Sequence, residues 1–137
     1  MTFEHFINKY INTKVDFDKA FGSQCVDLFR QYCQDVLGIP HTGSVDGARE
    51  LYERYKELPK EQKYFSQVSK KSVPQFGYVA VWGATNTNKY GHVALVVSRL
   101  DSANLLVFEQ NGFTQDGAKL VRRSTENLLG YLKYKGA

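Results

Sequence analysis

With 137 residues, 42% of them apolar and 23% charged, the chain has the composition of an ordinary globular protein and not of a disordered one. Its net charge of +4 comes from residues 71–137, but the one basic cluster within that segment, Arg122–Arg123, belongs to no nucleic-acid-binding motif, so no nucleic-acid partner is expected. Two cysteines exclude a disulfide framework and a cysteine-rich zinc site.

The first half of the chain predicts helices. Apolar side chains recur at helical spacing over residues 3–11 and again over 26–37, and Gly38-Ile39-Pro40 ends the second helix. Asp46 is suited to cap a third helix. The charged segment 56–72 predicts a loop with one short element.

The second half predicts strands. Apolar runs at 78–82, 92–98 and 105–109 are separated by turn-rich segments, and 131–134 predicts a last strand at the edge of the sheet. The runs 92–98 and 105–109 are joined by a short turn, so we expect them to pair as a hairpin. Helices followed by antiparallel strands predict one α+β domain over residues 1–137, with N-terminal helices packed against the sheet.

Cys25 lies at the predicted start of the second helix, where Ser23 is expected to be the cap. The positive end of the helix dipole stabilises a thiolate there, and free backbone N–H groups can bind an oxyanion. The alternative is a buried, inert cysteine, and helix position alone does not decide between the two. Cys33 lies among apolar residues within the helix and is assigned to the core.

His92 begins a strand directly after Gly91, a position suited to a cleft, although a histidine bound to backbone is the alternative. Glu109 and Asn111 are two residues apart at the end of the next strand and therefore share a face. A carboxylate and an amide that face an imidazole fix its tautomer and stabilise its cation, unless the pair faces water instead. With Cys25, this set predicts nucleophilic catalysis.

Three carboxylates and two carbonyls are spaced as in a calcium-binding loop. The carboxylates belong to Asp16, Asp18 and Asp27, and the carbonyls to Ala20 and Gly22. An EF-hand is not predicted, since its central glycine and its final glutamate are both replaced. A calcium site of another kind and a solvated acidic loop are the two interpretations.

These residues resemble the CHAP domains (cysteine, histidine-dependent amidohydrolase/peptidase) of phage endolysins and bacterial cell-wall hydrolases. The family pattern, in matching order over nearly the whole chain, is carried by Asp16-Phe-Asp18, Gly22-Ser-Gln24-Cys25-Val-Asp27, Val79-Ala-Val-Trp82-Gly, Gly91-His92-Val-Ala-Leu-Val-Val and Phe108-Glu109-Gln-Asn111-Gly. The family's Gly-Asp before the strand that ends in Trp is Gly77-Tyr78 here, a departure that concerns a local turn.

The resemblance implies a papain-like α+β fold and a peptidoglycan hydrolase that cleaves an amide bond of the cell wall through a thioester. The enzyme would be an N-acetylmuramoyl-L-alanine amidase or a stem-peptide or cross-bridge endopeptidase. The implied roles are nucleophile for Cys25, general base for His92, orienting carboxylate for Glu109 and accessory polar group for Asn111. The implied cofactor is Ca²⁺, as in a subset of such lysins, held by Asp16, Asp18, Asp27 and the carbonyls of Ala20 and Gly22; no organic cofactor is expected.

We expect the backbone N–H of Cys25, helped by the Gln24 side chain, to bind the oxyanion. Trp82 and Tyr90 are expected to line the substrate groove, although core packing is the default explanation for an aromatic side chain. Two alternatives stay open for the function. One is a cysteine amidase or peptidase that acts on a substrate outside the wall, and the other is a non-catalytic wall-binding module.

Bacterial peptidoglycan is the expected partner, and no oligomer is expected. No apolar run approaches the roughly 20 residues of a membrane-spanning helix, so membrane insertion is not expected either. The N-terminus lacks the basic and apolar regions of a signal peptide. The protein is therefore expected to be made in the host cytoplasm and to act on the wall after release at phage lysis, or when applied from outside.

Overall fold

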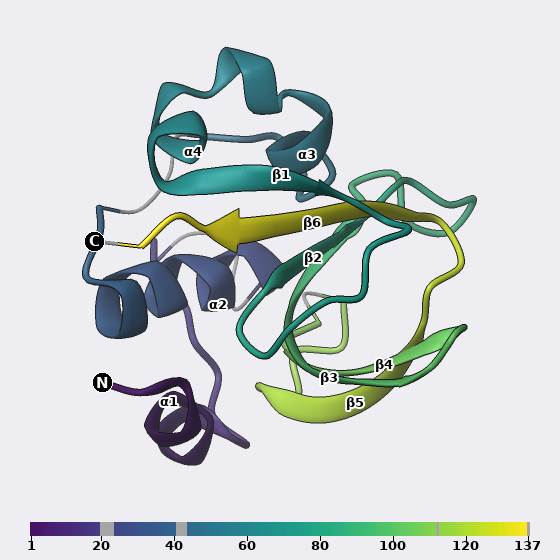
Figure 1. Ribbon diagram of the computed structural model, residues 1–137. Helices are drawn as coiled ribbons and strands as arrows, with labels where there is room; N and C mark the ends of the chain where they lie inside the picture. The colour runs from purple at the N-terminus through teal and green to yellow at the C-terminus, as the bar shows by residue number, and fades with distance from the viewer. Residues whose placement is uncertain (20–23, 41–43, 112, 137) are drawn as a thin grey trace.

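The computed structural model describes residues 1–19, 24–40, 44–111 and 113–136, with helices first in the chain and strands after them (Figure 1). The helical elements are α1 (Phe3–Tyr10), α2 (Cys25–Tyr32), the π-helical turn η1 (Cys33–Leu37), α3 (Glu50–Glu53), the 3-10 turn η2 (Tyr55–Glu57) and α4 (Pro59–Tyr64). The strands are β1 (Phe65–Ser69), β2 (Val79–Trp82), β3 (His92–Asp101), β4 (Asn104–Glu109), β5 (Lys119–Ser124) and β6 (Leu128–Tyr134). The predicted α+β class is confirmed.

The strands form one sheet in the order β1-β6-β2-β3-β4-β5, and each neighbouring pair is antiparallel. The expected hairpin of β3 and β4 is confirmed, with Leu95 opposite Phe108. The prediction that residues 131–134 lie at a sheet edge is wrong, because β6 lies between β1 and β2. The segment 56–72, expected to be a loop with one short element, forms η2, α4 and β1, and β1 supplies the outer neighbour of β6.

β5 is the other strand that the apolar pattern does not predict. It is an edge strand in which half of the residues are charged, and it pairs with β4 from Asn104 to Glu109. Charged side chains on an edge strand oppose pairing with another chain, and they also remove the apolar alternation by which a strand is recognised in a sequence.

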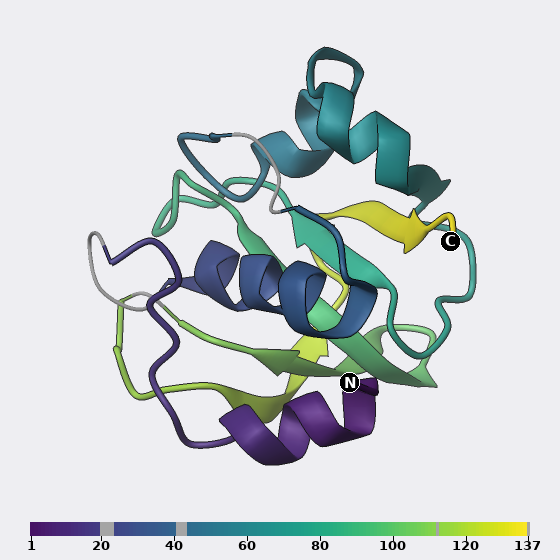
Figure 2. The same ribbon diagram turned by 90° about the vertical axis from the view of Figure 1, so that its left-hand side faces the viewer.

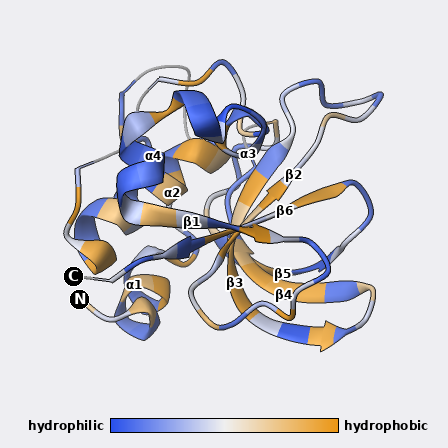
Figure 3. Cartoon of the chain, turned by 45° about the horizontal axis from the view of Figure 1, so that its top comes forward, coloured by the Kyte–Doolittle hydropathy of each residue, from blue (hydrophilic) through white to orange (hydrophobic). Residues whose placement is uncertain are grey.

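The helices cover one face of the sheet, and Figure 2 shows α1 and α2 lying across it. The main core lies between these layers and includes Phe6, Phe29, Leu95 and Phe108, each almost fully buried. A second apolar cluster, with Val96, Val107 and Tyr131, packs on the opposite face. Figure 3 shows the hydrophobic colouring along the central strands and mixed colouring on the helices, as expected for amphipathic elements.

The expected cap at Asp46 is wrong, since α3 begins only at Glu50. The turn before it is held against the segment that precedes β3: the N–H of Arg49 donates to the carbonyl of Tyr90 at 3.0 Å. A Cβ on Gly47 would lie 2.8 Å from that carbonyl oxygen, so Gly47 permits the close approach. This contact places residues 46–49 beside the start of β3, and the helix begins only after them, at Glu50.

Among the described residues, no helix combines the length and the apolar character needed to cross a membrane.

Candidate functional site

A cleft of about 950 Å³ opens where the N-terminus of α2 faces the ends of β2 and β3. Its walls come from segments far apart in the chain. The predicted site residues that line it are Asp18, Gln24, Cys25, Trp82, Tyr90, His92 and Asn111. The fold therefore gathers the predicted catalytic and substrate-binding residues around one space.

Cys25 is the first residue of α2 and is partly exposed. Gln24 is the N-cap, with extended backbone, and its N–H donates to the carboxylate of Asp27 at 3.0 Å. The cap therefore falls at Gln24 and not at Ser23, which lies outside the described residues. The first N–H groups of a helix have no partners within it, so they are available to a negatively charged group beside Cys25. Cys33 is fully buried in the core, as expected.

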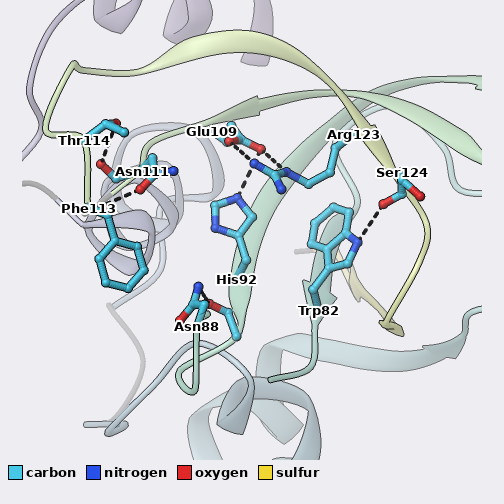
Figure 4. Close-up of polar contacts among 10 residues, drawn as sticks. Trp82, Asn88, His92, Glu109, Asn111, Phe113, Thr114, Arg123 and Ser124 are labelled. Carbon is cyan, nitrogen blue, oxygen red and sulfur yellow. Dashed lines mark hydrogen bonds and ion pairs between the residues drawn. The ribbon is translucent and has the colours of Figure 1, made fainter. Parts of the chain in front are cut away.

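His92 and Glu109 meet across the β3–β4 hairpin. Nε2 of His92 lies 3.1 Å from Oε1 of Glu109 (Figure 4). Glu109 is only 2% exposed, and its two oxygens also accept hydrogen bonds from Nε and Nη2 of Arg123, each at 2.6 Å. A buried carboxylate needs such partners, and here it receives a bidentate guanidinium and an imidazole.

These contacts set the protonation of the pair. Burial alone lowers the pKa of His92, but hydrogen bonds with Cys25 and Glu109 and the charges of both groups outweigh it and raise the pKa to about 9. Burial raises the pKa of Glu109, but its hydrogen bonds with His92 and Arg123 and their charges prevail and lower it to about 2. At neutral pH the site therefore holds an imidazolium beside a carboxylate, with the Cys25 side chain in hydrogen-bonding reach of the imidazole.

The two aromatic residues expected at the groove differ in exposure. Trp82 is 5% exposed; its ring lies 5.7 Å from the His92 ring and 5.8 Å from the Arg123 guanidinium, and its Nε1–H donates to the carbonyl of Ser124 (Figure 4). Trp82 thus mainly supports the charged groups of the site. Tyr90 is 46% exposed and offers its ring to the cleft.

Asn111 lies in the cleft, but its side chain serves its own loop. Its Oδ1 accepts a hydrogen bond from the N–H of Phe113 at 2.8 Å (Figure 4). Within the part of the chain that the structure describes, no hydrogen bond joins the Asn111 side chain to His92. The structure therefore brings Cys25, His92 and Glu109 together and leaves Asn111 at the side of this group.

The three predicted metal-ligating carboxylates also converge. One oxygen each of Asp16, Asp18 and Asp27 lies within 4.8 Å of the others. Oδ1 of Asp16 is buried with no hydrogen-bond partner among the described residues. Burial, and then the charges of Asp18 and Asp16, raise the pKa of Asp27 to about 6. Nη1 of Arg30 lies 3.5 Å from Asp18 and neutralises part of the negative charge of the cluster. The cluster can therefore still accept a cation.

This donor set fits a hard cation such as Ca²⁺, which binds carboxylate oxygens in flexible geometry. The expected carbonyl ligands of Ala20 and Gly22 lie outside the described residues. Asp27 also accepts the N–H of Gln24, so the cluster is tied directly to the residue before Cys25.

Sequence reasoning missed the role of Arg123, which it treated only as part of a basic pair. Arg123 belongs to β5, which the sequence does not predict as a strand because charged side chains interrupt its apolar pattern. Once Lys119–Ser124 is recognised as a strand, the alternation of side chains separates Arg122 from Arg123 and places them on opposite faces. This alternation is the signal in the sequence that distinguishes Arg123 from Arg122.

Helices packed on one face of an antiparallel sheet, with a cysteine at a helix N-terminus facing a histidine and a carboxylate on the strands, form a papain-like α+β fold. The chain belongs to the CHAP domain family, whose model matches residues 14–111.

One curated relative is Endolysin PlyTW of Staphylococcus phage Twort, 30% identical in an alignment of 115 positions that covers 79% of this chain and 23% of that protein. The chain thus spans about a quarter of the relative's length. Two solved structures share the fold. The wild-type endolysin LysIME-EF1 has a TM-score of 0.65 at 19% identity, over 94% of this chain and 61% of the other. Ly7917, with the hydrolyzing product of MDP, has a TM-score of 0.69 at 19% identity, over 96% of this chain and 61% of the other.

Proposed function

We propose that the chain is a peptidoglycan hydrolase of the endolysin type, which cleaves an amide bond of the bacterial cell wall through a thioester on Cys25. The observation that carries the proposal is the meeting of Cys25 with the His92–Glu109 pair, 3.1 Å from Nε2 to Oε1, in a cleft of about 950 Å³. Membership of the CHAP family and similarity to a phage endolysin support the choice of substrate.

In the proposed mechanism His92 already holds the proton of the Cys25 thiol, as the imidazolium described above, and Sγ attacks the carbonyl carbon of the amide. The oxyanion lies against the backbone N–H of Cys25, with the Gln24 side chain as a second donor. The raised pKa of His92 suits the next step, in which the imidazolium protonates the leaving amine as the C–N bond breaks. His92 then removes a proton from water, the hydroxide attacks the thioester, and the C–S bond breaks to restore Cys25.

The other groups act through these two. Glu109 fixes the tautomer and orientation of His92 and stabilises its cation, and Arg123 holds Glu109. Tyr90 offers an exposed ring to the substrate at the wall of the cleft. Two bonds fit this chemistry: the amide between muramic acid and L-alanine, and a peptide bond of the stem or cross-bridge.

We further propose that Asp16, Asp18 and Asp27 hold Ca²⁺. Oδ1 of Asp16, which has no hydrogen-bond partner within the described part of the chain, and the raised pKa of Asp27 support this, because a divalent cation would relieve both. Bound there, the ion would neutralise the repulsion among the carboxylates and brace the segment that precedes Cys25. For the place of action, we propose synthesis in the host cytoplasm and contact with peptidoglycan after release at phage lysis.

The test is a digest of purified Gram-positive sacculi analysed by mass spectrometry. Wild type is compared with Cys25→Ala, and Cys33→Ala serves as the matched control because it removes the thiol buried in the core. We expect soluble fragments with new termini from wild type and Cys33→Ala and none from folded Cys25→Ala. A new N-terminal alanine that frees the stem from muramic acid identifies the amidase, and a terminus within the stem or cross-bridge identifies the endopeptidase.

Absence of fragments from several wall chemotypes, with folded wild type, would overturn the proposal in favour of a substrate outside the wall or a binding module. Tight wall binding that Cys25→Ala leaves unchanged, without release of amines, would point to the binding module.

A further inference from the structure

Gln110 has no exposed side-chain surface, although it carries a polar amide next to Glu109. All its amide groups are satisfied by backbone. Oε1 accepts the N–H of Val15 at 2.8 Å, and Nε2 donates to the carbonyls of Val15 at 2.7 Å and Gln24 at 2.9 Å. A buried amide without partners would cost several kcal/mol, so these three bonds hold the two backbone segments firmly in place.

The two residues that Gln110 joins each directly precede a residue of the candidate site. Val15 precedes the carboxylate Asp16, and Gln24 precedes Cys25. One side chain thus holds together both ends of the segment that leads into α2. The carbonyl of Gln24 is the acceptor for Asp27 N–H as well, so Gln110 contacts the cap of the helix that carries Cys25.

Gln110 follows Glu109 at the end of β4, and successive side chains of an extended chain point in opposite directions. The Glu109 side chain goes to His92, whereas the Gln110 side chain goes to the segment before Cys25. Glu109 therefore holds the side chain of His92, and its neighbour Gln110 holds the backbone directly before Cys25. Any shift of one relative to the other changes the distance between thiol and imidazole.

We propose that Gln110 is a positioning residue that sets the placement of Cys25 relative to His92. The inference rests on the proposed function, in which these two side chains exchange a proton. Displacement of a catalytic group by about 1 Å can lower a rate about 100-fold, which is the effect expected when the three bonds are lost.

The test uses Gln110→Met, which keeps the volume and removes every hydrogen bond, and Gln110→Glu, which keeps the acceptor for Val15 and removes both donors. Leu132→Ala is the matched control, because Leu132 is fully buried on β6, a strand that contributes no residue to the wall of the cleft. Circular dichroism melting identifies folded variants and the temperature below which they are compared.

Two measurements follow. Initial rates on purified sacculi, over a range of sacculus concentration, should give a maximal rate about 100-fold lower for both Gln110 variants with little change in the half-saturating concentration. Alkylation of Cys25 by iodoacetamide at neutral pH, with Cys25→Ala as the blank, should slow by about tenfold or more. Leu132→Ala should change neither, even where its melting temperature falls as far as that of Gln110→Met.

Alkylation needs no wall substrate, so it reports on Gln110 even if wild type fails to digest sacculi and the proposed function falls. Folded Gln110→Met or Gln110→Glu with the alkylation rate of wild type would overturn the inference. Equal slowing in Leu132→Ala would also overturn it, since loss of stability alone would then explain the effect.

Discussion

Arg123 binds both carboxylate oxygens of Glu109, with Nε and Nη2 each 2.6 Å from one of them. The guanidinium lies 5.8 Å from the Trp82 ring and is itself held in place there. Oε1 of Glu109 is shared between Arg123 and Nε2 of His92, so the arginine determines which way the carboxylate presents itself to the imidazole. The orienting group of the site is therefore a pair, contributed by β4 and β5.

Replacing Arg123 should lower the free energy of unfolding, and the loss should be larger when the charge is removed than when only the bidentate contact is removed. Arg123→Lys keeps the charge but cannot form the bidentate contact, and we expect a loss of about 1.5–3 kcal/mol in the free energy of unfolding. Arg123→Met removes the guanidinium and leaves the buried Glu109 carboxylate with His92 as its remaining partner, for which about 3–5 kcal/mol is expected. Both should lower activity on sacculi. Urea unfolding and the digest check this.

Arg122 offers the matched control, because it is exposed and meets Asp101 only at 3.5 Å. Arg122→Met should change stability by less than about 1 kcal/mol and leave activity intact. An Arg123→Met protein as stable and active as Arg122→Met would contradict the role assigned to Arg123.

The His92–Glu109 pair predicts how stability depends on pH. The pKa of His92 is raised from 6.5 to about 9, so its contribution is complete below pH 6.5 and is lost as the pH rises through 9. The pKa of Glu109 is lowered from 4.5 to about 2, so its contribution is complete above pH 4.5 and is lost as the pH falls through 2. The pair should therefore stabilise the fold most between about pH 4.5 and 6.5.

Melting temperature measured from pH 3 to 10 checks this, with Glu109→Gln as the variant and Glu126→Gln as an exposed control. Glu109→Gln should be less stable than wild type near pH 6, and the difference should shrink towards both ends of the range. A difference independent of pH would show that the pair does not titrate as described.

Gln24→Ala tests the second donor to the oxyanion. The hydrogen bond from the Gln24 backbone N–H to the Asp27 carboxylate is preserved in this variant, so that half of the capping box remains. Loss of one oxyanion donor costs about 2.7–4 kcal/mol of barrier, so the maximal rate on sacculi should fall about 100- to 1,000-fold with the fold unchanged. Gln31→Ala on the same helix is the control. Near-full activity of Gln24→Ala would remove its side chain from this role.

The carboxylate cluster predicts a response to Ca²⁺ removal. EDTA should lower the melting temperature and the activity, and Ca²⁺ should restore both, since three converging carboxylates repel one another without a cation. Asp16→Asn should bind Ca²⁺ more weakly in calorimetry and respond less to EDTA. If calorimetry detects no Ca²⁺ binding and EDTA has no effect, the cluster is a solvated acidic loop.

Gly91→Ala should disturb the start of β3. Gly91 has φ +72°, and a Cβ there would lie 2.4 Å from the Trp82 carbonyl oxygen and 2.7 Å from Cβ of Arg49. Gly38 has a similar φ of +65° with open space around it, so Gly38→Ala measures the conformational strain alone, about 1 kcal/mol. Gly91→Ala should cost clearly more in urea unfolding and lower activity by moving His92. Equal costs for the two variants would show that the close approach at Gly91 is relaxed without effect.

Local patterns in the sequence determined much of this protein. The helical periodicity before Tyr10 and after Cys25, the apolar runs of β2, β3 and β4, and the hairpin of β3 and β4 all follow from side chains close together in the chain. The same patterns placed Cys25 at a helix start and His92 and Glu109 on paired strands, because helix caps and short turns are local. The identities of the three residues were therefore available before any tertiary structure was known.

Only the tertiary structure decided what lies around them. β6 is internal because β1, drawn from a charged segment, pairs with it, and β5 becomes a strand because β4 offers an edge. Arg123 reaches Glu109, and Gln110 reaches Val15 and Gln24, through contacts between residues far apart in the chain. Such contacts depend on which strands pair and which faces are buried, and that choice is made by packing of the whole chain, which no short window of sequence contains.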